Sequence, residues 1–215
     1  AIFGVMINML FFFKGLEYTS PIHASAITIT VPIIILILSA VILKENVSKL
    51  KIVGVTLGLI GALVLTIYGK SARAGDNVPL GNLLVFLNAI SYSIYVIMIK
   101  KLTLKYHPFT FIKWLFLFGL IMLIPFGYND LKAVEWHTFT PNAIWSVVFV
   151  VVGATFGTYL FNPLALNKLK ASTVGIFIYL QPVIAGLFAI SIGADFIDPI
   201  KIGAMLLIFL GVFLV

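Results

Sequence analysis

The sequence has no cysteine and little charge. None of its 215 residues is Cys, and charged residues make up only 10% of the chain. The absence of Cys excludes a disulfide framework and a thiolate metal site. A soluble domain carries about 25% charged residues, so this chain has too few polar groups to cover a surface in water. We therefore expect the chain to be surrounded by a lipid bilayer.

Long apolar runs take the place of charge. Hydrophobic residues make up 62% of the chain, and the mean hydropathy is +1.19. In lipid the backbone must pair its own polar groups, so only helices and closed barrels cross a membrane. The runs are continuous and longer than the alternating segments of about ten residues that build barrels. We predict eight spanning helices, at about 1–16, 21–43, 50–69, 80–99, 108–127, 141–166, 171–193 and 200–215.

Positive charge is unevenly divided between the loops on alternate sides. One set of loops holds eight Lys and a single acid, Glu45, whereas the other set holds five basic residues and six acids. Cytoplasmic loops are enriched in Lys and Arg, so we expect a multi-pass protein of the bacterial inner (plasma) membrane with the first set inside. The net charge of +7 then needs no nucleic-acid partner. The eight lysines are Lys44, Lys49, Lys51, Lys100, Lys101, Lys105, Lys168 and Lys170.

Several landmarks recur at a constant offset of 150 residues. Pro32 corresponds to Pro182, and Glu45 corresponds to Asp195. Five predicted spans separate the copies, so the two copies must face opposite sides of the membrane. Such an inverted-topology repeat is typical of secondary transporters, whose substrate site lies between the halves. Chance similarity between apolar helices is the alternative. Further matches are Lys51-Ile52 with Lys201-Ile202 and Gly61 with Gly211.

The repeat also predicts the domain organisation. Residues 1–69 hold the last three helices of an N-terminal repeat, and residues 80–215 hold all five helices of a C-terminal repeat. At this offset the partner of the helix that begins near Gly81 lies before Ala1, so we expect two further spans ahead of this sequence. The predicted fold class is an all-α membrane protein with an inverted five-plus-five arrangement, of which eight helices are present here.

Short motifs follow one another in a fixed order along almost the whole chain. They are the turn Gly15-Leu16-Glu17-Tyr18-Thr19-Ser20-Pro21, Val31-Pro32, Lys44-Glu45, the Gly-rich stretch from Gly54 to Gly61, Asn88-Ala89-Ile90-Ser91-Tyr92-Ser93-Ile94-Tyr95 and Tyr179-Leu180-Gln181-Pro182-Val183. This order resembles the EamA type of the drug/metabolite transporter (DMT) superfamily. The resemblance implies ten helices, cytoplasmic termini and transport, often export, of small metabolites. Asp195 and Lys14 depart from the family pattern, which has Glu and a small or apolar residue there.

Polar side chains form a stripe on each of two predicted spans. Each stripe has four polar residues at the spacing i, i+3, i+4, i+7, which is one face of a helix. These stripes predict the lining of a substrate cavity, and hydrogen bonding between helices is the alternative. Asn8 matches Thr158 in the repeat and is added to the cavity. The stripes are Thr155, Thr158, Tyr159 and Asn162, and Asn88, Ser91, Tyr92 and Tyr95.

Pro32 and Pro182 lie near the middle of their predicted spans. A proline lacks the backbone donor and clashes with the carbonyl four residues earlier, which belongs here to Thr28 or Ile178. A kink at these positions predicts a hinge that opens the cavity to substrate; a static packing kink is the alternative. The cavity residues that the kinks add are Thr28, Thr30, Tyr179 and Gln181.

Two further features allow more than one interpretation. Lys14 lies near the outer end of an apolar helix, where it snorkels to the interface, pairs with Glu17, or provides a counter-charge for an anionic substrate. The sequences Gly54-xxx-Gly58 and Gly153-xxx-Gly157 permit close helix contact. We interpret both as contacts within one chain, although the same pattern also leaves a homodimer open.

The sequence lacks the patterns of catalytic or cofactor sites. Its three His are scattered, with no nucleotide-binding loop and no Ser/His/Asp arrangement, so we expect neither an enzyme nor a cofactor or metal. No acid lies deep in a span, which favours a facilitator or exchanger, or coupling through the expected further helices. We predict a transporter (a secondary carrier, facilitator or exporter) that moves small polar or amphipathic metabolites by alternating access. The alternatives are a membrane scaffold or receptor subunit and an intramembrane lipid-modifying enzyme.

Overall fold

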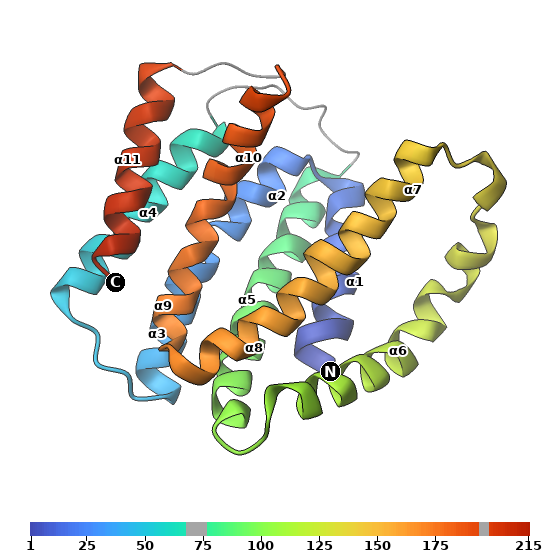
Figure 1. Cartoon of the computed structure of the whole chain (residues 1–215), viewed down its shortest axis with the longest axis horizontal. Helices are drawn as coiled ribbons and strands as arrows, with labels where there is room; N and C mark the ends of the chain where they lie inside the picture. The colour runs from blue at the N-terminus through green and yellow to red at the C-terminus, as the bar shows by residue number, and fades with distance from the viewer. Residues whose placement is uncertain (68–76, 194–197) are drawn as a thin grey trace.

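The computed structural model describes residues 1–67, 77–193 and 198–215, and all regular structure in these ranges is helical. Figure 1 shows long helices packed side by side, with their connections at two opposite ends. Within these ranges, six helical segments are long and apolar enough to cross a membrane. Those segments are His23–Ile42, Lys49–Ile67, Val78–Thr103, Pro108–Ala133, Pro141–Lys168 and Ala171–Ser191.

Each predicted span is occupied by one helix or by consecutive helical segments, as the all-α prediction requires. Four of the charged residues used to assign loops or the repeat, Lys70, Arg73, Asp76 and Asp195, lie outside the described residues. The segments are η1 (Ile2–Met6), α1 (Ile7–Tyr18), α2 (Pro21–Thr28), α3 (Val31–Ile42), α4 (Lys49–Ile67), α5 (Val78–Thr103), α6 (Pro108–Ala133), η2 (Trp136–Thr138), α7 (Pro141–Val148), η3 (Phe149–Gly157), α8 (Thr158–Lys168), α9 (Ala171–Ile176), η4 (Phe177–Tyr179), α10 (Leu180–Ser191) and α11 (Pro199–Phe213).

Several helix starts are encoded by a capping side chain followed directly by proline. Ser20 Oγ accepts a hydrogen bond from the backbone N–H of His23 at 3.2 Å, at the start of α2. Asp198 Oδ1 accepts one from the backbone N–H of Lys201 at 2.9 Å, at the start of α11. A cap satisfies one of the unpaired donors of the first turn, and a proline in that turn has no donor to lose. Local chemistry therefore fixes where these helices begin.

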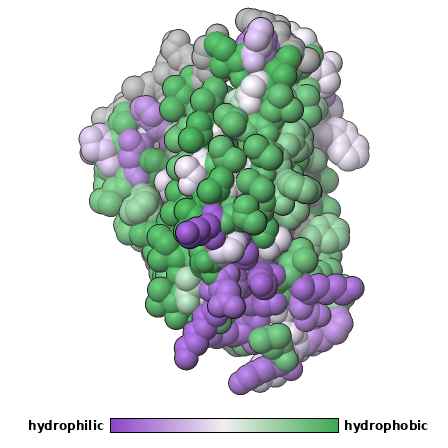
Figure 2. Space-filling view, turned by 90° about the vertical axis from the view of Figure 1, so that its left-hand side faces the viewer, coloured by the Kyte–Doolittle hydropathy of each residue, from purple (hydrophilic) through white to green (hydrophobic). Residues whose placement is uncertain are grey.

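The two ends of the bundle differ in charge. The connections from α3 to α4, from α5 to α6 and from α8 to α9 lie at the lower end in Figure 1, and these connections and the adjoining helix ends carry the eight lysines of the first set. Figure 2 shows hydrophilic side chains gathered at this end and apolar side chains covering the face above it. We call it the lysine-rich end. The apolar belt above it is the surface that contacts the bilayer.

Glycines bring α4 and α11 into backbone contact. A Cβ added to Gly61 would lie 2.5 Å from the carbonyl oxygen of Ala204, and one added to Gly54 would lie 2.7 Å from that of Gly211. At the 150-residue offset, Gly54 corresponds to Ala204 and Gly61 to Gly211, so exchanging the two halves exchanges the two contacts. The pair is therefore self-complementary, like a two-fold interface contained in one chain.

Departures from α-helical geometry recur at the same offset. The π-helical η1 corresponds to residues 152–156, which lie inside the π-helical η3. The break between α2 and α3, at Ile29 and Thr30, corresponds to the junction of η4 and α10. Pro32 and Pro182 lie in the first turns of α3 and α10, where proline is tolerated. The expected kinks are thus breaks between two helical segments.

Replacing Gly61 by Ala should destabilise the protein. The added methyl would meet a backbone carbonyl on α11 that cannot rotate away, and overpacking of this kind costs about 1–3 kcal/mol. We expect a lower midpoint of thermal unfolding in detergent, followed by size-exclusion chromatography. Gly203→Ala on α11 is the control, because a Cβ added to Gly203 would meet no atom within 4 Å apart from its chain neighbours and its own helix backbone. Equal midpoints for the two variants would contradict the proposed backbone contact.

Candidate functional site

A cavity of about 370 Å³ lies between the N-terminal helices (η1 to α4) and the C-terminal helices (α5 to α11). Its walls come from α1, α2 and α3 on one side and from α5, η3, α8, η4 and α10 on the other. Among the described residues, no Asp, Glu, Lys or Arg side chain lines it. Ten of the residues expected at a substrate cavity line it: Asn8, Thr28, Asn88, Tyr92, Tyr95, Thr155, Thr158, Tyr159, Asn162 and Gln181.

Three other expected residues do not line this cavity. Thr30 donates its hydroxyl to the carbonyl of Ile27 at 2.7 Å, which closes the turn between α2 and α3. Ser91 is buried and donates to the carbonyl of Phe3 at 2.7 Å. Tyr179 is fully buried, and its ring packs on α4. Helix periodicity places a residue on a face, but it does not say which neighbouring helix that face contacts.

Several polar groups of the cavity wall are paired within the protein. Asn88 Nδ2 donates to the carbonyl of Asn8 at 2.7 Å, and Asn162 Nδ2 donates to Tyr92 Oη at 2.8 Å. The Tyr159 hydroxyl donates to the carbonyl of Gly4. These bonds join α1 to α5, α8 to α5 and η1 to α8, so they hold the walls in place. For these residues of the stripes, hydrogen bonding between helices, the alternative to cavity lining, therefore applies.

Four side chains in the lining remain available to a solute. None of them makes a hydrogen bond to another described residue. Two are amides and two are hydroxyls, so together they can both donate and accept hydrogen bonds. They come from α1, η3, α8 and α10, which places available groups on both sides of the cavity. The four are Asn8, Thr155, Thr158 and Gln181.

Both helix breaks reach this cavity. Thr28 and Ile178, which lie four residues before Pro32 and Pro182, are both part of the lining. A proline nitrogen cannot donate, so both carbonyls lack their α-helical partner. Irregular backbone at membrane depth is tolerated where it is buried in protein or lines a cavity. The unpaired carbonyls at the two helix breaks therefore lie where irregular backbone is tolerated, at the wall of a cavity.

Two further cavities overlap the central one. A cavity of about 570 Å³ extends away from the lysine-rich end and shares Phe12, Thr28 and Gln181 with the central cavity. A cavity of about 180 Å³ extends toward the lysine-rich end, where its lining includes Ile35 and Val96. Those two side chains are almost fully buried. The three spaces form one series that is widest away from the lysine-rich end and stops at an apolar floor.

Lys14 lies outside the lining of the central cavity. Its Nζ pairs with Glu17 Oε2 at 2.8 Å, and both side chains are more than half exposed. An exposed pair of this kind contributes little to stability, because water and salt screen the attraction. Lys14 borders a lateral cavity between α1 and α6, together with Asp130; Met9 and Phe13 line both this cavity and the central one. Of the three interpretations of Lys14, the structure therefore shows the ion pair with Glu17.

Two tyrosine hydroxyls are buried without a partner among the described residues. They belong to Tyr95 and Tyr179. The Tyr95 ring lies against the Tyr159 ring, at 5.6 Å between centroids, in the wall of the central cavity. Within 1–67, 77–193 and 198–215, no cluster of His, Asp and Glu has the arrangement of a metal site. The candidate site is thus an uncharged, polar and aromatic cavity.

A polar cavity enclosed by membrane-spanning helices, where two halves of a chain meet, is the arrangement of a membrane transport protein. The chain belongs to the EamA-like transporter family, whose model matches residues 1–67 and 79–215. This membership confirms the family resemblance and the prediction of a multi-pass membrane transporter.

Similar proteins agree with this membership. The chain is 30% identical, over its whole length, to an uncharacterized transporter of Archaeoglobus fulgidus, of which it covers 74%. It is 26% identical to the uncharacterized transporter YyaM of Bacillus subtilis, with 96% of this chain and 68% of the relative covered. A crystal structure at 17% identity superposes with a TM-score of 0.81, covering 96% of this chain and 71% of the other. That likeness shows the fold alone.

The hydrogen bond from Asn88 to the backbone of Asn8 should matter for stability more than Asn8's own side chain. Asn88→Ala removes the amide that donates to the part-buried carbonyl of Asn8 and joins α5 to α1, which costs roughly 0.5–1.5 kcal/mol, so we expect a lower midpoint of thermal unfolding. Asn8→Ala removes an amide that has no partner in the described ranges and should leave the midpoint nearly unchanged. The same loss in both variants would contradict this division of roles.

Proposed function

We propose that this protein is a secondary carrier, facilitator or exporter that moves a small polar or amphipathic metabolite by alternating access. One observation carries the proposal: the central cavity lies between the two halves of the chain, and both halves contribute available polar side chains to it. A site at the junction of the halves becomes accessible from one membrane face or the other when the halves rock.

Two inverted repeats, residues 1–69 and 80–215, are part of this proposal. The exchange-symmetric contacts of α4 and α11, the paired π-helical segments and the paired helix breaks all support it, because each recurs at the offset of 150 residues. A chance resemblance between apolar helices gives no reason for these departures from regular helix geometry to recur together. With the lysine-rich end cytoplasmic, the wide end of the cavity series faces the other side of the membrane.

The lining favours a solute without net charge. An ion in this cavity would lose its hydration without meeting an opposite charge, at a cost of several kcal/mol. Amides and hydroxyls pair instead with the hydroxyl, carbonyl or amide groups of a neutral or zwitterionic metabolite. Phe12, Phe13 and Tyr92 add aromatic surface for an apolar portion of the solute. These features support a small amphipathic metabolite as substrate.

Uptake by proteoliposomes tests the proposal. The full-length protein is reconstituted and supplied with a panel of labelled neutral, zwitterionic, cationic and anionic metabolites. We expect saturable flux of at least one neutral or zwitterionic member and none above protein-free liposomes for the anions. Flux of no member in either direction, with correctly folded protein, would support a scaffold or receptor subunit instead.

Thr158 and Gln181 should contribute to transport rather than to folding. Thr158→Val and Gln181→Leu keep the approximate shape of each side chain and remove hydrogen-bonding groups that face the cavity. Losing one neutral hydrogen bond, worth roughly 0.5–1.5 kcal/mol, should reduce flux about two- to tenfold at low substrate concentration. Thr56→Val is the matched control, because Thr56 is exposed on α4 and donates only to the carbonyl of Ile52. Full flux in both cavity variants would argue against this cavity as the substrate site.

A further inference from the structure

We infer that Glu45, Ser172 and Lys51 form a latch that holds the lysine-rich end closed, and that this latch must release in each transport cycle. The inference rests on the proposed alternating-access function. Glu45 follows α3 and Lys51 lies in the first turn of α4, whereas Ser172 lies at the start of α9. The latch therefore joins the N-terminal helices to the C-terminal helices at the end opposite the cavity opening.

The latch is a continuous chain of hydrogen bonds. Lys51 Nζ donates to Ser172 Oγ at 2.7 Å, and Ser172 Oγ donates to Glu45 Oε2 at 2.8 Å. Glu45 Oε1 also accepts from the backbone N–H of Ala171 at 2.9 Å, so this carboxylate caps α9 from the other half of the chain. Hydrogen bonds to charged groups are shorter and stronger than neutral ones. Every contact in this chain would be lost if α9 moved away from α3 and α4.

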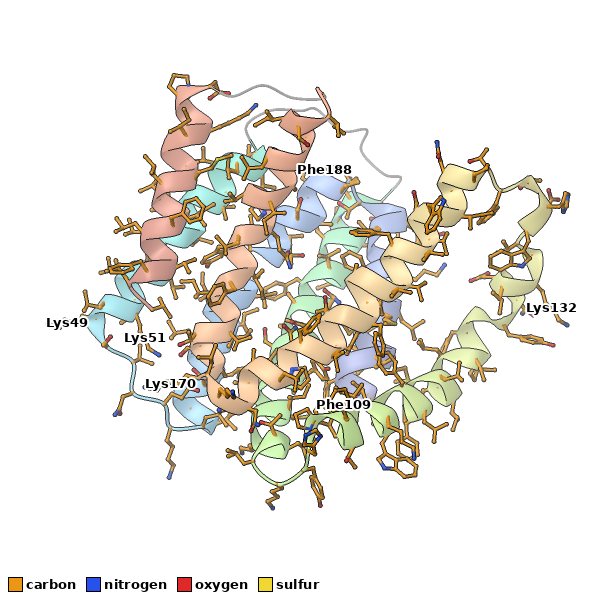
Figure 3. The ribbon with its side chains drawn as sticks, in the orientation of Figure 1. Lys49, Lys51, Phe109, Lys132, Lys170 and Phe188 are labelled. Atoms are coloured by element: carbon orange, nitrogen blue, oxygen red, sulfur yellow. The ribbon has the colours of Figure 1, made fainter. Side chains whose placement is uncertain are left out.

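The lysine at one end of the latch is buried. Only 8% of Lys51 is exposed, although most lysines at this end project into solvent. Figure 3 shows Lys51 between the start of α4 and the start of α9, close to Lys170. A buried ammonium needs hydrogen-bond acceptors, and Ser172 provides one that belongs to the other half of the chain. Moving the two halves apart would leave the Lys51 ammonium without this acceptor, so the contact between Lys51 and Ser172 stabilises the closed state.

An apolar seam above the latch completes the closure. Ile35 on α3 is fully buried, and a Cβ added to Gly175 on α9 would lie 3.1 Å from it. The absence of a side chain at Gly175 lets α3 and α9 approach closely. Ile35 and Gly175 also form part of the floor of the cavity series. The same seam therefore ends the cavity and leads down to the latch.

The matched seam at the opposite end is open. At the 150-residue offset, Gly175 corresponds to Ser25 on α2, and Ile35 corresponds to Ala185 on α10. Ser25 and Ala185 both line the cavity of about 570 Å³ that extends away from the lysine-rich end. Ile35 and Gly175 are thus in contact at the lysine-rich end, whereas a cavity lies at the equivalent positions, Ser25 and Ala185, at the opposite end. In the second state of the carrier the lysine-rich end is open and the opposite end is closed, which requires the latch to break.

Cysteine labelling tests the latch without a substrate. The chain has no Cys, so Val174→Cys, which lies in the cavity floor, gives a single reporter. An impermeant maleimide is added to inside-out vesicles, where only the lysine-rich end is accessible. Adding Ser172→Ala, which removes both of the serine's latch bonds, should accelerate labelling about tenfold. Glu45→Gln, which keeps the acceptor for Ala171 but removes the charge, should produce a smaller acceleration.

A second serine provides the matched control. Ser191→Ala removes a hydroxyl that donates only to the carbonyl of Phe188 on its own helix, and labelling should stay at the parental rate. Unchanged labelling in folded Ser172→Ala protein, or equal acceleration by Ser191→Ala, would overturn the latch. If Ser172→Ala is not recovered as a single size-exclusion peak, Glu45→Gln decides in the same way. Flux in the same vesicles tests the proposed function separately, since accelerated labelling without flux would retain the latch and reject transport.

Discussion

The hydrocarbon core of a bilayer offers no partner for a backbone N–H or C=O, and the architecture of this protein depends on that constraint. Regular helices satisfy it without help, which is why the described chain consists of helices and short connections. Two departures from regular helix, the breaks at Ile29 and Thr30 and at η4, lie where the two halves of the chain meet. Unpaired backbone at these breaks thus lies where protein groups, water or a solute can satisfy it.

Helix association in lipid has little hydrophobic driving force, so close packing and hydrogen bonds replace it. Gly15 and Gly81 let α1 and α5 approach until a Cβ added to Gly81 would lie 2.9 Å from the Gly15 carbonyl oxygen. Small residues do the same between α4 and α11. By contrast, α6 exposes large apolar side chains such as Leu120 and Phe126 to lipid. Contacts between helix backbones therefore define a rigid centre, and bulky side chains face the bilayer.

Much of this organisation follows from the sequence, because its signals are local or periodic. Apolar runs predicted the helices, and the polar stripes predicted seven of the ten polar residues that line the central cavity. The sequence did not distinguish Asn88, which is bonded to another helix, from Asn8, whose side chain has no hydrogen-bond partner among the described residues, because that distinction depends on the distance between two helices. Nor could spacing show that Glu45 meets Ser172, since 127 residues separate them. A contact of that kind exists only after the halves have packed.

Alternating access requires two states of similar free energy, which limits how strong a closing contact can be. A direct buried Lys–Glu pair would be costly to separate, because each charge would then be left without a partner. Here a serine hydroxyl bridges Lys51 and Glu45, and both residues lie at the lysine-rich end, where water can reach them once the seam opens. Released charges at this depth regain hydration, so the penalty for opening is smaller than at the membrane midplane. The position of the latch therefore matters as much as its chemistry: the same three groups beside the central cavity would lock the carrier in one state.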